Sequence, residues 1–166
     1  MKMPKLPMLT AGLLLACGVH ATDAEHIRAS HAWIRVLPSA LPAGGYVTLE
    51  NDSDQPIALQ SASSTNYADV MLHQSSTAGG VSRMSMVDAM SVPAHGKAQL
   101  APAGYHLMLM QPKQPIKPGD TVVLTLKFSD GSTLAIDFIA RPANALDAGD
   151  EHAMPGMDHD GIQHAH

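Results

Sequence analysis

The sequence is poor in cysteine, and Cys17 is the only one among its 166 residues. It lies in a stretch that has the form of a cleavable export signal, since Lys2 and Lys5 precede an apolar run over residues 6–19. Small residues at positions 19 and 21 favour cleavage after Ala21. The mature chain would then contain no cysteine. It could form no disulfide, no redox-active dithiol and no cysteine-ligated zinc or blue-copper site.

A second interpretation of the same segment makes Cys17 a lipid-attachment residue. Residues 14–17 read Leu-Leu-Ala-Cys, but a leucine two positions before the cysteine fits a lipobox poorly. Both interpretations predict export, and we expect a periplasmic protein with residues 1–21 removed. The apolar run is too short to span a bilayer comfortably, so no membrane span is expected.

Basic and aromatic residues are also scarce. Aromatic residues make up 4% of the chain and charged residues 15%. Once Lys2 and Lys5 are removed, 8 basic and 15 acidic side chains remain, so the formal charge of the mature chain is −7. A net negative charge argues against nucleic acid or an anionic membrane surface as the partner.

What the chain does contain is a series of short strand-like segments separated by turns rich in Pro, Gly, Asn and Asp. No segment of convincing length has a helical period. The expected strands cover residues 26–36, 44–51, 57–61, 70–74, 81–87, 92–100, 106–110, 121–128 and 132–139. Many short strands at close intervals predict an all-β fold, an antiparallel β-sandwich of two sheets, over residues 22–141.

The strand predicted at residues 106–110 has an unusual face. Alternation places His106, Met108 and Met110 on one side and Leu107 and Leu109 on the other. The leucines are suited to the core. The opposite face carries one imidazole and two thioethers, which are soft and neutral donors that suit Cu(I).

The segment around His73 repeats this arrangement. Met71 and His73 share one face, whereas Val70 and Leu72 share the other, and Met84 lies between the two segments in the sequence. Residues two apart on a strand are about 7 Å apart, so the side chains of one face can converge on one ion. A single Met usually fills a gap in a core, and only the coincidence on two strands suggests a metal site.

The spacing of four of these residues resembles the signature of the periplasmic PCu(A)C copper chaperone family. Ten residues separate His73 from Met84, twenty-one separate Met84 from His106, and one separates His106 from Met108. The similarity extends over about residues 32–139. Three flanking segments also resemble the family: residues 70–73, 92–94 and 104–110.

This resemblance implies a cupredoxin-like Greek-key sandwich that binds Cu(I) at an exposed edge through His73, Met84, His106 and Met108. It also implies a role and partners: delivery of copper to the dinuclear copper centre of cytochrome c oxidase, alongside a Sco-type protein. Met71 is expected to lie beside these ligands, either as a reserve ligand or as a residue that contacts the ligands without binding the ion. We expect Met86 and Met110 to be packing or rim residues, and the protein to be a monomer.

The C-terminal segment, residues 142–166, differs in composition from the rest. It has almost no large apolar residue, which predicts a flexible tail. Short His-rich tracts commonly bind metal, and imidazole together with carboxylate suits Cu(II). The candidate ligands of this second, weaker site are His152, Met154, Met157, His159, His164 and His166.

An enzyme and a copper-buffering protein are the two alternatives to a copper carrier. An enzyme is not expected, because the sequence contains no His-Glu-x-x-His stretch and no assignable set of nucleophile, base and acid. A copper-buffering or resistance protein would use the same ligands and differ only in its partner and affinity. The sequence does not separate that alternative from a dedicated chaperone.

Overall fold

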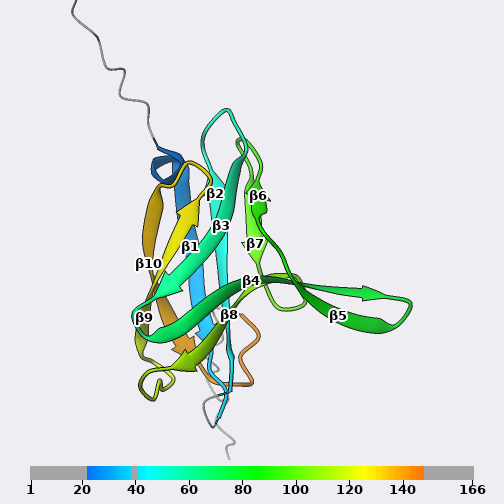
Figure 1. The fold of residues 1–166 in the computed structure, drawn as a ribbon, viewed down its shortest axis with the longest axis vertical. Helices are drawn as coiled ribbons and strands as arrows, with labels where there is room; N and C mark the ends of the chain where they lie inside the picture. The colour runs from blue at the N-terminus through cyan, green and yellow to red at the C-terminus, as the bar shows by residue number, and fades with distance from the viewer. Residues whose placement is uncertain (1–21, 39–40, 148–166) are drawn as a thin grey trace, which may run out of the picture.

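The computed structural model describes residues 22–38 and 41–147 and shows an all-β fold (Figure 1). A short 3₁₀ turn, η1 (Asp23–His26), precedes the strands. The strands are β1 (Ile27–Arg35), β2 (Ala43–Asn51), β3 (Ile57–Ser64), β4 (Tyr67–Ala78), β5 (Val81–Met86), β6 (Met90–Val92), β7 (Lys97–Leu100), β8 (Tyr105–Pro112), β9 (Thr121–Phe128) and β10 (Thr133–Arg141). No helix among these residues is long and apolar enough to cross a membrane.

Hydrogen bonds join all ten described strands into one sheet with the order β5-β4-β8-β7-β2-β1-β10-β9-β3-β6, and β8 also pairs with β2. This sheet folds back on itself (Figure 1), and it encloses one large core of buried residues. The all-β prediction is confirmed, but the pairing is not purely antiparallel, because β1 runs parallel to β10 and β7 parallel to β8. The segment predicted as one strand over residues 92–100 forms β6 and β7, because Pro93 and Gly96 form a turn between them.

Alternation along each strand sends one set of side chains into the core. Leu107 and Leu109 are fully buried, as predicted, and so are Leu124, Leu126 and Phe138 on β9 and β10. Burying apolar surface of this kind contributes about 25 cal/mol per Å². The core therefore fixes which face of β4 and β8 points outward, and that outer face carries the histidines and methionines.

The packed part of the chain extends past the predicted boundary at residue 141. Ala145 is only 5% exposed and forms a small cluster with Trp33 and Tyr46 on the outer face of β1 and β2. The Arg35 guanidinium lies 5.4 Å from the centre of both rings, and its Nε donates to the Ala145 carbonyl oxygen at 3.1 Å. Residues around Ala145, which were predicted to belong to the flexible tail, are therefore packed, since the sequence alone did not reveal this aromatic cluster.

The hairpin of β4 and β5 extends away from the body of the molecule as an arm (Figure 1). Strand β4 is twelve residues long, far longer than the predicted 70–74, and its last residues, 75–78, pair only with β5. Every residue of β5 is exposed. Gly79 and Gly80 at the tip have positive φ angles of 59° and 78°, a conformation that glycine adopts without strain.

Candidate metal centre

Strands β4 and β8 are neighbours, and their register brings together the two His-Met pairs predicted from the sequence. His73 lies directly opposite His106, and Met71 directly opposite Met108. Directly opposite residues in an antiparallel pair share a face and have Cβ atoms about 5 Å apart. The imidazole rings of the two histidines are 5.9 Å apart between centroids and inclined by 58°. One imidazole pair and one thioether pair therefore form adjacent rows on the outer face.

His106 is held in a defined orientation. Its Nδ1 donates to the Gly104 carbonyl oxygen at 3.0 Å, and the ring is only 6% exposed. The same carbonyl accepts the backbone N–H of Ser75 at 3.0 Å, which links the start of β8 to β4. A histidine that donates from Nδ1 presents the lone pair of Nε2 to a metal.

His73 has a buried nitrogen without a hydrogen-bond partner. Its Nδ1 makes no hydrogen bond with any residue in the described part of the chain. Burial lowers the pKa of His73, and the neighbouring His106 lowers it further. This imidazole consequently stays neutral, and able to bind a metal, at lower pH than a free histidine. A buried, neutral nitrogen that lacks a partner is well suited to a soft metal ion.

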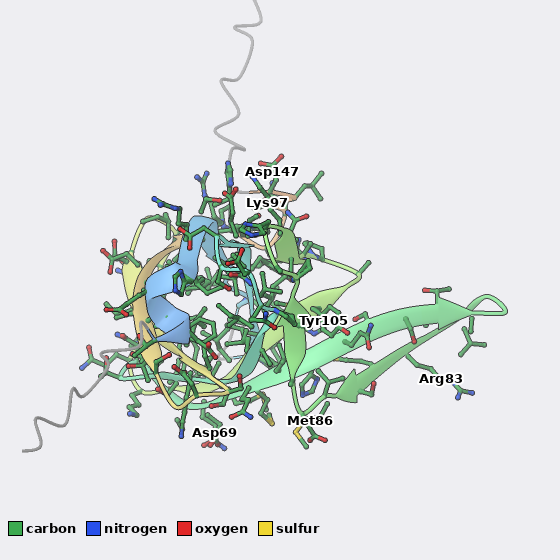
Figure 2. All side chains as sticks on the ribbon, turned by 90° about the horizontal axis from the view of Figure 1, so that it is seen from above. Asp69, Arg83, Met86, Lys97, Tyr105 and Asp147 are labelled. Atoms are coloured by element: carbon green, nitrogen blue, oxygen red, sulfur yellow. The ribbon has the colours of Figure 1, made fainter. Side chains whose placement is uncertain are left out.

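The third element of the site is β5, which carries Met84 and Met86 on the same outer face. Met86 lies directly opposite His73, whereas Met84 lies opposite Ser75, one row further along the arm. The two side chains are 67% and 54% exposed, respectively. Met86 is labelled in Figure 2 at the base of the arm, beside the body of the molecule. Of the two roles expected for Met86, packing or rim, this exposure fits a residue at the rim and not one that packs in the core.

On its other side the site borders β2. Gly44 lies opposite Met108, and the Tyr46 side chain folds over Gly44 so closely that a Cβ there would clash with its hydroxyl group. Tyr46 is only 7% exposed, and burial raises its pKa. Neither Gly44 nor Tyr46 could be assigned to this place from the sequence, because nothing local indicates that β2 lies beside Met108.

The donors of this site are all uncharged. Among residues 22–38 and 41–147 there is no group of three or more His, Cys, Asp or Glu side chains able to hold a metal ion. Zinc and hard cations prefer such groups, whereas thioethers with imidazole suit Cu(I). The arrangement can therefore bind a soft monovalent ion.

The remaining predicted residues fall into two groups. Met110 is on the same face of β8 but lies opposite Asp69, two rows from the histidine pair. The six tail residues, His152, Met154, Met157, His159, His164 and His166, lie outside the described residues, as does Cys17. Of the histidines left unassigned by the sequence, His26 and His95 pair with Asp52 at 2.8 Å and with Asp54 at 2.7 Å.

Comparisons with known proteins identify the family and the fold. Residues 27–140 match the profile of the LpqE-like family, described as "Putative lipoprotein LpqE-like". A curated relative from Leifsonia xyli subsp. xyli (strain CTCB07), "Putative lipoprotein Lxx21020", is 30% identical over 129 residues, which cover 72% of this chain and 77% of the relative.

Solved structures show the same fold. DR1885 from Deinococcus radiodurans in its Cu(I) form is 36% identical, with a TM-score of 0.57, over 79% of this chain and 85% of that one. Its apo form is 35% identical, with a TM-score of 0.56, over 86% of this chain and 94% of that one. The copper-bound PCuAC domain of PmoF2 is 23% identical, with a TM-score of 0.61, over 74% of this chain and 98% of that domain. These matches confirm the predicted cupredoxin-like fold.

Proposed function

Since this chain belongs to the LpqE-like family of PCuAC copper chaperones, we propose that it carries Cu(I) on His73, Met84, His106 and Met108. The family is one of copper chaperones rather than enzymes. The observation that carries the proposal is the cross-strand register of His73 with His106 and of Met71 with Met108. We assign Met71 as a reserve ligand, because it shares this face without belonging to the four-residue spacing.

Physical chemistry supports Cu(I) as the ion. Two neutral imidazoles and neutral thioethers add no negative charge, so they stabilise a soft monovalent ion better than Cu(II). Thioethers also cannot be lost to disulfides in an oxidising compartment. The Cu(I) form of DR1885, at 36% identity, supports the same ion. Competition titration of the mature chain and a His106→Ala, Met108→Ala double variant tests the proposal, as argued in the Discussion.

For the tail we propose a second, weaker site for Cu(II). It rests on the composition of residues 148–166 and on the packing of Ala145 against Trp33 and Tyr46, which tethers the tail to the outer face of the sheet. At about 3.3 Å per residue, nineteen extended residues span up to about 63 Å. The tail could thus collect copper and pass it to the histidine pair.

Removal of residues 148–166 is expected to reduce the Cu(II) bound per molecule while Cu(I) affinity stays unchanged. The truncation stops after Asp147 so that the Ala145 contacts remain. Equilibrium dialysis with Cu(II), followed by metal analysis, measures the stoichiometry. A control chain of full length with His152, His159, His164 and His166 changed to Asn separates loss of ligands from loss of length. Unchanged Cu(II) uptake by both variants would disprove the tail site.

As acceptor we propose the copper subunit of cytochrome c oxidase, alone or together with a Sco-type protein. The mature protein, loaded with Cu(I), is expected to transfer copper to the isolated soluble copper domain faster than it releases copper to a chelator of equal affinity. Separation of the two proteins followed by metal analysis at several times gives the rate. Equal rates would favour the alternative function, a copper-buffering or resistance protein without a dedicated acceptor.

The family description as a lipoprotein supports an exported protein, and we place the mature chain in the periplasm. Two mature forms follow from the sequence: a chain that starts at Thr22 after signal cleavage, or one that starts at a lipidated Cys17. The intact mass of the protein isolated from its native membrane and periplasmic fractions distinguishes these forms.

A further inference from the structure

The outer face of β5, β4 and β8 consists of rows of side chains that cross the strands. One row contains Met86, His73 and His106. The next row contains Met71 and Met108 and continues onto Gly44 of β2. Met84 belongs to a different row, with Ser75, on the far side of the histidines. Met86 is therefore in line with the two imidazoles, and Met84 is not.

The two methionines of β5 also differ in their distance from Met108. With strands about 4.8 Å apart and a rise of about 3.4 Å per residue, the Cα of Met84 lies about 17 Å from that of Met108. The corresponding separation for Met86 is about 12 Å. Two methionines can share one ion only when their Cα atoms are within about 13 Å, given their length and a metal–sulfur bond of about 2.3 Å. In this register Met86 can share an ion with Met108, whereas Met84 reaches it only if the arm bends.

Packing does not account for Met86. Its side chain is 67% exposed, the highest value among the exposed methionines of the described chain. Its position is nevertheless well defined, because Val87, the next residue, donates its backbone N–H to the Leu72 carbonyl oxygen at 3.0 Å and packs against the core. A large apolar side chain that is exposed, aligned with two imidazoles and attached to a backbone fixed in place is suited to binding a soft ion.

We propose that Met86 is itself a Cu(I) ligand, and that it shares one coordination position with Met84. This inference rests on the proposed function. In the observed register Met86 holds the ion together with His73, His106 and Met108. When the arm bends over the histidine row, the Met84 thioether takes the place of the Met86 thioether. Only ligands exchange, so the ion keeps its charge and no electron moves.

Cu(I) affinities of three leucine variants test this proposal. Leucine keeps the apolar volume of methionine and removes the sulfur. A Met84→Leu, Met86→Leu double variant is expected to bind Cu(I) at least about tenfold more weakly than Met84→Leu alone, the size expected for one coupled ligand. Met110→Leu, a methionine of the same face but two rows away, is the matched control and is expected to bind as the wild type does.

Equal affinities of the double variant and of Met84→Leu would overturn the role of Met86. A second measurement is the NMR signal of the methionine methyl groups in the Met84→Leu protein. The Met86 methyl resonance is expected to shift when one equivalent of Cu(I) is added, and an unchanged resonance would overturn the proposal. Neither failure affects the proposed function as long as the His106→Ala, Met108→Ala protein loses its Cu(I).

Discussion

The His106→Ala, Met108→Ala double variant is expected to bind Cu(I) at least about a hundredfold more weakly than the wild type, a loss of about 3 kcal/mol. The change removes the imidazole opposite His73 and the thioether opposite Met71, so each of the two rows loses one donor. The measurement is anaerobic competition with a chromogenic Cu(I) chelator on residues 22–166. We expect one tight equivalent for the wild type.

Two controls test whether binding is lost because the variant unfolds or because any histidine has been removed. His106 is nearly buried and donates to the Gly104 carbonyl, so the far-UV circular dichroism and the denaturant midpoint of the variant must be measured as well. His95→Ala is a matched control, since His95 pairs with Asp54 at the surface and is expected to leave Cu(I) affinity unchanged. If the folded double variant bound Cu(I) as tightly as the wild type, the spacing of the four residues would have been misleading. The tail would then be the main metal site.

Phe138→Ala is expected to lower the free energy of unfolding by about 3–5 kcal/mol, the range found when a buried aromatic side chain is truncated. Phe138 is fully buried on β10 and lies opposite Val122 of β9, so its removal leaves a cavity in the only large core of the described chain. Urea denaturation followed by circular dichroism measures the difference. A loss of this size is a large fraction of the stability of a single domain.

Val123→Ala on the neighbouring strand is the control for this prediction. Val123 is 41% exposed, and its truncation is expected to cost less than about 1 kcal/mol. Similar losses for Val123→Ala and Phe138→Ala would contradict the burial pattern and therefore the assignment of faces. That assignment also determines which side chains of β4 and β8 point outward, so this experiment tests the site indirectly.

If the proposed function holds, the position of the donors would explain how one site both holds and releases copper. His106, held by its hydrogen bond to the Gly104 carbonyl, and the buried Nδ1 of His73 lie at the inner end of the site. The thioethers of β5 lie at its exposed outer end, on an arm that stands clear of the body (Figure 2). An acceptor can therefore approach the ion from the side of its weaker ligands, and thiolates of that acceptor would replace thioethers first.

The sequence by itself determined the faces of the two strands that carry the site. Alternation has a period of two, which is a local property of the backbone, so Leu107 and Leu109 could be assigned to the core and His106 and Met108 to the opposite face. The same local signal indicated an all-β fold. The spacing of the four residues then indicated the family, because it matches a known pattern.

Only the tertiary structure decided which strands are neighbours and in what register. Contacts between distant parts of the chain decide three features of the site and its surroundings. They pair His73 with His106, they place Met86 rather than Met84 in the histidine row, and they bring Ala145 to Trp33. Register follows from how whole faces pack, and a shift of one residue would move every side chain to the other face. Local periodicity therefore revealed the candidate donors, and long-range packing decided which of them lie side by side.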